Sequence, residues 1–425
     1  MDITLSRPDY SCAVLAPTSK SAAHRALICA AFADKPTSMR ISGAGEDIAA
    51  TIACLSALGA KIDEKTDAQG ESSLLITPIS ELPREAVLDC GESGSTLRFL
   101  VPIAAVLGIK TAFLRHGRLP QRPMSPLSEL LTANGVTLSD REDGALVLSG
   151  KLAPGHYEIA ANVSSQFITG LLFALSLCDL PSTLTLLGEI ESAPYIDMTV
   201  GALAAFGAAP TISEDRRSFG IPGCIAQRLC SPGRLLPEGD FSGAAFPLAA
   251  GAIGAHAVCV SGLDLSSSQG DRAILELLER FGARVDRDPA NGSVTVSPAP
   301  LHGIQIDARQ IPDLVPILAV IAATAEGETV ISGAARLRIK ESDRIATTAA
   351  LLTALGGDVT ATDDGLIIHG RSLSGGTVNG AGDHRIVMSA AIASLVANGP
   401  VTVTGIEAVA KSYPRFFDEV IPSRG

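Results

Sequence analysis

Residues 17–34 read PTSKSAAHRALICAAFAD, a short polar loop followed by an Ala-rich segment whose apolar residues have helical spacing. The same pattern returns five more times, at a period of roughly 70–75 residues that exceeds the period of the common solenoid repeats. The chain therefore contains six copies of one structural unit. The other five copies lie at residues 90–108, 162–179, 239–255, 310–327 and 381–399.

Each copy continues in a similar way after its first helix. A short β-like run follows most copies, for example VTVTG at residues 401–405, and an amphipathic segment that ends on glycine comes next. Glycine suits the left-handed position that closes a helix. The first helix is apolar on all sides and is predicted to be buried, whereas the amphipathic second helix should lie outside. The predicted terminal glycines are Gly59, Gly135, Gly207, Gly282 and Gly356.

The length of the chain predicts more than one domain. It has 425 residues, more than a single hydrophobic core normally organises. Six units divide into two domains of three, with the break expected in the Pro- and Gly-containing stretch at residues 224–240. One strand is expected over residues 3–15, before the first polar loop, and it could belong to either domain.

The composition excludes several classes of protein. The formal net charge is −12, which argues against a general nucleic-acid or anionic-membrane surface. The apolar runs are too short to span a bilayer, and the first residues do not resemble a secretory signal. Eight cysteines without metal-ligand spacing are typical of reduced, mostly buried thiols. We therefore expect a soluble, cytoplasmic protein.

The charges are densest in the stretch RLRIKESDR, residues 336–344. Asp343 has an ordinary explanation as an acidic residue at a helix start. Lys340 and Arg344 oppose the helix dipole there, an arrangement that makes most sense if an anion binds. The alternative is a solvated surface charge cluster.

Similar polar residues recur at the starts of the other apolar helices. Lys20, Arg25, Arg98 and Arg385 lie in or near first helical turns. The neighbouring serines could cap the helices or bind phosphate. Together these groups predict a site for a multiply charged small molecule, although GESGSTLR lacks the pattern of a nucleotide P-loop. The serines are Ser19, Ser21, Ser93, Ser95, Ser164 and Ser165, and further loop cations are Arg115, Arg118, Arg122 and Lys411.

In this order, the motifs resemble the 5-enolpyruvylshikimate-3-phosphate synthase family across nearly the whole chain. KESDR and GDHR, in register with SSQ, are the most specific strings. The matching stretches are SKSAAHRAL, GESGSTLRFL, LPQRPM, VSSQFITGLL, PYIDMT, IPDLVPILAV, RIKESDRI, GDHRIVMSAA and AKSYPRFF.

This resemblance implies an α/β (α+β) protein with the enolpyruvyl transferase fold. In that fold two similar domains each contain three βαβαββ repeats, with helices buried inside and helix N-termini facing an interdomain cleft. The domains would comprise residues 1–17 plus 235–425 and residues 18–234, so the first strand joins the last three repeats. Hinge crossings near 17 and 234 would allow ligands to close the domains.

The family's reaction transfers the enolpyruvyl group of phosphoenolpyruvate to the 5-hydroxyl of shikimate 3-phosphate, releasing phosphate through a tetrahedral ketal. It belongs to the shikimate pathway of aromatic amino-acid biosynthesis. The resemblance implies no metal or organic cofactor and two small-molecule substrates, and we expect a monomer.

The resemblance also implies two sets of binding residues. Those for shikimate 3-phosphate are Lys20, Ser21, Arg25, Ser164, Ser165, Gln166, Ser192, Tyr195, Asp313, Arg336 and Lys340. Those for phosphoenolpyruvate are Lys20, Gly94, Arg122, Gln166, Arg344, Arg385 and Lys411.

Four of the matching residues are expected to be catalytic. Asp313 would accept the hydroxyl proton and Glu341 would protonate the methylene carbon. Lys20 and His384 would assist proton transfer and stabilise charge. From the sequence alone Asp313 could equally be an ordinary residue at a helix start.

Several positions depart from the usual family pattern. Glu92 and Ser93 replace a common Asn-Ala pair, Phe99 replaces Pro, and Arg336 replaces an Asn found in some members. Gly94 adds no side chain beside the phosphoenolpyruvate residues, which predicts sensitivity to the inhibitor glyphosate.

Two alternatives remain. UDP-N-acetylglucosamine enolpyruvyl transferases share the fold, but they carry a reactive Cys in the loop before an Arg-Pro pair, and residues 117–122 contain none. A non-catalytic binding protein of six repeats would need only the cations.

Overall fold

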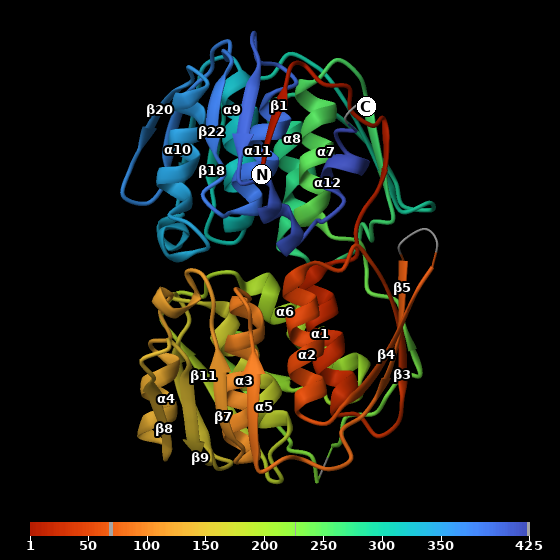
Figure 1. Cartoon of the computed structure of the whole chain (residues 1–425), viewed down its shortest axis with the longest axis vertical. Coiled ribbons are helices and arrows are strands. Elements are labelled where there is room, and N and C mark those ends of the chain that lie inside the picture. The colour runs from red at the N-terminus through yellow and green to blue at the C-terminus, as the bar shows by residue number, and fades with distance from the viewer. Residues whose placement is uncertain (68–70, 226, 423–425) are drawn as a thin grey trace. The chain divides into compact units, whose positions relative to one another are not determined.

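The computed structural model describes residues 1–67, 71–225 and 227–422. The chain forms two compact units. The central unit is Lys20–Pro237, and the terminal unit combines Met1–Ser19 with Glu238–Gly425. Each unit is described separately below (Figure 1).

The central unit contains three copies of the repeat. Its helices are α1 (Lys20–Ala31), α2 (Glu46–Ala57), α3 (Gly94–Leu107), η1 (Leu119–Gln121), α4 (Leu127–Ala133), α5 (Ser165–Ser176) and α6 (Ala193–Ala205). Its strands are β3 (Thr37–Ser42), β4 (Lys61–Thr66), β5 (Glu71–Thr77), β6 (Glu85–Asp89), β7 (Lys110–Leu114), β8 (Val136–Asp140), β9 (Leu146–Gly150), β10 (His156–Ala160), β11 (Ser182–Leu187), β12 (Thr211–Ile212), β13 (Ser218–Ile221) and β14 (Arg234–Leu235).

The terminal unit contains the other three copies. Its helices are α7 (Phe241–Ile253), η2 (Gly270–Ala273), α8 (Ile274–Phe281), η3 (Pro312–Leu314), α9 (Val315–Thr324), η4 (Ala335–Ile339), α10 (Arg344–Ala354), α11 (His384–Ala393), η5 (Ile406–Lys411) and α12 (Phe416–Glu419). Its strands are β1 (Asp2–Leu5), β2 (Ala13–Leu15), β15 (Val258–Ser261), β16 (Arg284–Asp288), β17 (Ser293–Ser297), β18 (Gln305–Asp307), β19 (Glu328–Ser332), β20 (Asp358–Ala361), β21 (Leu366–His369), β22 (Gly376–Asn379) and β23 (Val401–Thr404).

The sheets show the βαβαββ repeat directly. In the order β6-β7-β9-β8, the first two strands are parallel and the other neighbours are antiparallel. The same order recurs in β10-β11-β13-β12 and β18-β19-β21-β20. A helix connects each parallel pair, as a parallel crossover requires. This confirms the predicted repeat and fold class.

Distant strands complete the other three sheets. Strand β14 pairs with β3, and β2 pairs with β15, both in parallel. Strand β1 instead lies antiparallel to β23. The single strand expected over residues 3–15 is therefore wrong. Pro8 lacks a backbone N–H and Arg7 has a φ of 45°, so the chain breaks there into two strands that join different sheets.

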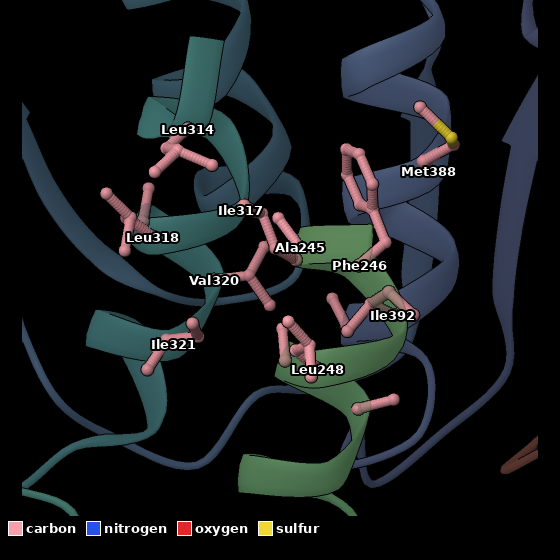
Figure 2. Close-up of a cluster of buried hydrophobic side chains, with 14 of the residues drawn as sticks. Ala245, Phe246, Leu248, Leu314, Ile317, Leu318, Val320, Ile321, Met388 and Ile392 are labelled. Carbon is pink, nitrogen blue, oxygen red and sulfur yellow. The ribbon is translucent and has the colours of Figure 1, made fainter. Parts of the chain in front are cut away.

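The apolar first helices lie inside the units, as predicted. In the terminal unit α7, α9 and α11 contact one another. Figure 2 shows Phe246 of α7 near Met388 of α11, and Val320 of α9 pointing toward α7. In the central unit α3 contacts α5, and a Cβ at Gly170 would lie 2.3 Å from the Arg98 carbonyl oxygen. The small side chains therefore permit close helix packing.

The second helices end as the sequence predicts. In α8, Ile274, Leu278 and Phe281 are buried, whereas Glu276 is exposed. Gly282 then closes the helix with a φ of 109°. The other four predicted glycines also have positive φ, which costs glycine little because it has no Cβ.

The cysteines match the prediction only in part. All eight lie among the described residues and none forms a disulfide, but only Cys29, Cys54, Cys90 and Cys178 are buried. Within the described chain no helix is long and apolar enough to cross a membrane.

Candidate active site

Arg344 is the centre of a buried ion cluster in the terminal unit. It begins α10, and its side chain is only 1% exposed. Its guanidinium lies 2.8 Å from an oxygen of each of three carboxylates, those of Asp313, Glu341 and Asp383. Although burial lowers the pKa of Arg344, these carboxylates outweigh burial and raise it. Arg344 is therefore a permanent cation.

Three helix starts supply this cluster. Asp313 lies in η3 directly before α9, and Asp383 is the N-cap of α11. The Asp383 carboxylate accepts hydrogen bonds from the Arg385 backbone N–H and the Ser342 hydroxyl, both at 3.0 Å. Asp343 caps α10 by accepting from the Ala346 N–H at 3.1 Å, as the sequence suggested. The repeat thus brings residues from distant parts of the chain together.

Asp313 also lies beside two further cations. Its carboxylate is 3.4 Å from Arg385 and 3.7 Å from Lys340. Burial favours protonation of Asp313, but the charges of Arg385, Lys340 and Arg344 hold its pKa well below the usual value. Desolvation lowers the pKa of Lys340 to about 8, although Asp313 and Glu341 oppose this shift. Asp313 is therefore ionised at neutral pH, while Lys340 titrates not far above it.

The other predicted residues of the terminal unit surround the start of α11 and η4. His384 is the first residue of α11 and is 2% exposed. The Lys411 amine donates to the Gly382 carbonyl at 2.7 Å, immediately before that helix. Arg336 donates to the Arg309 carbonyl at 2.8 Å and lies near enough to Lys340 to lower its pKa.

Lys20 begins α1 in the central unit. Its amine lies 2.8 Å from the Asp47 carboxylate of α2. Behind it, a His24 ring nitrogen contacts the Thr51 hydroxyl at 2.7 Å. Burial, together with the charges of Lys20 and Arg25, lowers the pKa of His24 well below its ordinary value. His24 is therefore a neutral, structural histidine.

Arg25 connects three helices of the central unit. It donates to the Thr199 and Thr169 hydroxyls at 3.0 and 3.3 Å, and to the Ser21 and Tyr195 carbonyls at 2.8 Å. Burial lowers its pKa to about 10, so it remains charged at neutral pH. These four bonds use most of the five N–H donors of a guanidinium.

Gln166 is positioned by residues of α3. Arg98 donates to its amide oxygen at 2.6 Å, and its amide nitrogen donates to the Ser95 hydroxyl at 3.0 Å. Ser164 caps α5 by accepting from the Gln166 N–H at 3.3 Å. Ser165 then begins the helix, and Ser192 precedes α6 with a left-handed φ of 54°.

Gly94 lies directly against Arg122. A Cβ built on Gly94 would be 2.7 Å from a terminal nitrogen of the guanidinium. This is closer than real Cβ contacts allow, so any larger residue would displace Arg122. Glycine is therefore required for the observed position of this cation.

Two of the cations at helix starts do not need an anionic ligand to explain them, contrary to the prediction from the sequence. Lys20 and Arg344 have protein carboxylates beside them, so neither cation alone demands an anionic ligand. Asp47 and Asp383 were missed as partners because both read as ordinary residues at helix starts. The signal that could have found them is an acid at the start of one helix together with a cation at the start of another.

Within the described part of the chain, no group of three or more His, Cys, Asp or Glu residues could hold a metal ion.

Comparison with known proteins identifies the family. The model of the EPSP synthase (3-phosphoshikimate 1-carboxyvinyltransferase) family matches residues 8–420. A relative from Clostridium acetobutylicum with that enzyme's name is 40% identical over 408 residues, covering 95% of this chain and 93% of the relative. One from Methanocorpusculum labreanum, with the same name, is 38% identical and covers 99% and 98%.

Solved structures agree with the fold. The EPSP synthase of Acinetobacter baumannii superposes with a TM-score of 0.78 at 25% identity, covering 99% of this chain and 98% of that one. The enolpyruvyl transferase NikO of Streptomyces tendae has a TM-score of 0.75 at 19% identity, covering 99% and 97%, and supports the fold alone. The chain therefore belongs to the EPSP synthase (3-phosphoshikimate 1-carboxyvinyltransferase) family.

Proposed function

We propose that this protein transfers the enolpyruvyl group of phosphoenolpyruvate to the 5-hydroxyl of shikimate 3-phosphate, releasing phosphate through a tetrahedral ketal. The reaction belongs to the shikimate pathway. The observation that carries the proposal is the cluster of Asp313, Glu341 and Arg344 in a chain that matches the family over residues 8–420. It combines possible proton donors and acceptors with cations suited to phosphate.

Asp313 is the proposed base. Its neighbouring cations keep the carboxylate ionised, so it can accept the proton of the substrate hydroxyl. The same cations weaken its basicity, and binding of substrate anions to them would restore it.

Glu341 is the proposed proton donor to the methylene carbon. It must be protonated for this role, whereas Arg344 at 2.8 Å favours the carboxylate. A substrate anion beside Arg344 would reverse that preference. Lys20 and His384 would stabilise the charge that develops during the reaction.

We propose that both units contribute substrate contacts. For shikimate 3-phosphate the residues are Lys20, Ser21, Arg25, Ser164, Ser165, Gln166, Ser192, Tyr195, Asp313, Arg336 and Lys340. For phosphoenolpyruvate they are Lys20, Gly94, Arg122, Gln166, Arg344, Arg385 and Lys411. We also propose a cytoplasmic monomer in which the crossings near residues 17 and 234 act as hinges.

The direct test is phosphate release from phosphoenolpyruvate by the purified protein, with and without shikimate 3-phosphate and without added metal. Release that requires shikimate 3-phosphate is expected. Release only with UDP-N-acetylglucosamine would show that this protein uses the acceptor of the UDP-N-acetylglucosamine enolpyruvyl transferases. No release with either acceptor would overturn the proposed transferase.

Glu341→Gln is expected to lower kcat by about 10²–10⁴-fold, the usual contribution of a general acid. Substrate affinity should change much less, because the surrounding cations remain. Turnover and calorimetric binding should be measured on the same preparation. Unchanged turnover would remove Glu341 from the chemistry.

Gly94→Ala is expected to raise the KM for phosphoenolpyruvate about tenfold, equivalent to about 1.4 kcal/mol. The new methyl group would displace the Arg122 guanidinium, which its Cβ would otherwise approach to 2.7 Å. We propose that glyphosate inhibits the wild type and that its inhibition weakens in this variant. The matched control is Gly201→Ala in α6, where a Cβ meets no atom within 4 Å. Equal KM values in the two variants would contradict the prediction, and an unchanged wild-type rate in millimolar glyphosate would exclude inhibition.

A further inference from the structure

Asp271 is a buried acid that the proposed mechanism does not use. It lies in η2, between β15 and α8, and is 2% exposed. The preceding Gln269 ties this loop to the start of α7. Its side chain accepts from the Phe241 N–H at 3.1 Å and donates to the Gly239 carbonyl at 2.8 Å. The position of Asp271 is therefore well defined.

The Asp271 carboxyl group has one hydrogen-bond partner. The Ser242 hydroxyl donates to its Oδ2 atom. Its Oδ1 atom is buried and has no hydrogen-bond partner among the described residues. A buried carboxylate with one unsatisfied oxygen is costly, and binding a proton reduces that cost.

The charges around Asp271 belong to the candidate active site. Asp313 from η3, Arg385 from α11 and Asp240 from the start of α7 all interact with it electrostatically. Burial, with Asp313, raises its pKa to about 7, while Arg385 and Ser242 oppose this shift. Glu238 is hydrogen-bonded to Ser267 and Gln269 of the same loop. Burial raises the pKa of Glu238 as well.

The neighbouring acids already match the cations before Asp271 is counted, and Asp240 adds a further acid near it. Three cations, Arg344, Arg385 and Lys340, stand against three acids. The acids are Asp313, Glu341 and Asp383. Ionisation of Asp271 would therefore add a further negative charge that interacts with Arg385.

We propose that Asp271 is a positioning residue that sets the pH range of phosphoenolpyruvate binding. When neutral, it does not compete with the substrate anion for Arg385. When it loses its proton, the carboxylate competes for Arg385 and repels the substrate. This inference rests on the proposed function, because it takes Arg385 as a phosphoenolpyruvate ligand. Coupling is reciprocal, so bound phosphoenolpyruvate would also favour proton uptake by Asp271.

The test compares Asp271→Asn with wild type from pH 6 to 9 at fixed ionic strength and saturating shikimate 3-phosphate. Asn preserves the shape and can still accept from Ser242. Between pH 6 and 8.5, the KM of wild type for phosphoenolpyruvate should rise about tenfold more than the KM of Asp271→Asn. A roughly tenfold effect lies within the usual range of coupling between two sites. At pH 6 the two kcat values should agree within about twofold, because the neutral forms are alike. Asp288→Asn, at an exposed position, should follow wild type at every pH.

Ser242→Ala provides an independent variant. It removes the hydrogen bond that stabilises the carboxylate, so the rise in KM should move to higher pH. Parallel pH profiles for wild type, Asp271→Asn and Ser242→Ala would overturn the proposal. If Asp271 had only a structural role, its substitution would lower thermal stability without changing how the KM for phosphoenolpyruvate depends on pH.

Calorimetric titration of phosphoenolpyruvate without shikimate 3-phosphate, so that no turnover occurs, separates this inference from the proposed function. If wild type binds but releases no phosphate, the proposed reaction fails while the pH comparison still stands. If affinity is equally pH-dependent in wild type and Asp271→Asn, the role of Asp271 fails whatever the turnover.

Discussion

Asp313→Asn is expected to lower kcat by about 10²–10⁴-fold, because it removes the proposed proton acceptor while preserving the shape of the side chain. The carboxylate contacts Arg344 at 2.8 Å and lies near Arg385 and Lys340. Its loss adds one net positive charge, so the affinity for the anionic substrates should be equal or higher. A loss of kcat without a rise in KM would indicate an interaction needed in the transition state.

The measurement requires kcat, both KM values and thermal stability from one preparation. Asp307→Asn is the matched control, since it removes an acid from an exposed ion pair with Arg309 in the same unit. Such a pair contributes about 0–1 kcal/mol and lies outside the cluster. A kcat for Asp313→Asn within fivefold of the control would exclude Asp313 as the base.

Arg344→Met is expected to destabilise the terminal unit by about 3–5 kcal/mol, the usual cost of removing one partner of a buried ion pair. The change leaves three carboxylates without their shared guanidinium. Asp383 suffers most because it is completely buried. The loss of stability should be largest in α10 and α11, because the cluster connects the starts of these two helices.

The loss of stability caused by Arg344→Met should become smaller as pH falls. In wild type burial favours protonation of Asp383, but Arg344 holds its pKa below the usual value. The ion pair thus contributes stability above the unfolded pKa of about 3.9, and that contribution is lost as pH falls through the lower folded pKa. Without Arg344, burial favours protonated Asp383, so the difference between variant and wild type should shrink as pH falls from 7 toward 4.

Hydrogen exchange at pH 7 and pH 5 can follow α10 and α11 separately from the central unit. Arg284→Met is the control because it removes an arginine from an exposed pair with Asp286. Similar protection in α10 for Arg344→Met and the control would show that the buried cluster does not stabilise this unit.

Much of the fold could be predicted because each repeat carries its own local signals. Apolar helices without a polar face, such as α9, indicate burial whatever surrounds them. The glycine after the second helix, for example Gly282, closes that helix in any fold. Lys340, Arg344 and Arg385 were also identifiable, because a cation at a helix start is unusual in itself.

The partners of these cations could not be predicted in the same way. Asp383 lies 39 residues from Arg344, and Asp47 lies 27 residues from Lys20. Each acid reads locally as an ordinary helix-start residue. Only the tertiary packing of separate helices places it beside a particular cation. Asp271 was missed for the same reason, since its neighbours Asp313 and Arg385 come from two later repeats.

By itself, the sequence determined the repeated unit, the buried and exposed helices and the family to which the chain belongs. These depend on periodicity, caps and motifs within tens of residues. Tertiary structure alone decided that residues 2–5 and 13–15 join separate sheets, that β14 completes the first repeat, and that three carboxylates share Arg344. Pairing between distant strands and the electrostatic balance of buried groups depend on which segments pack together, and no local pattern specifies that.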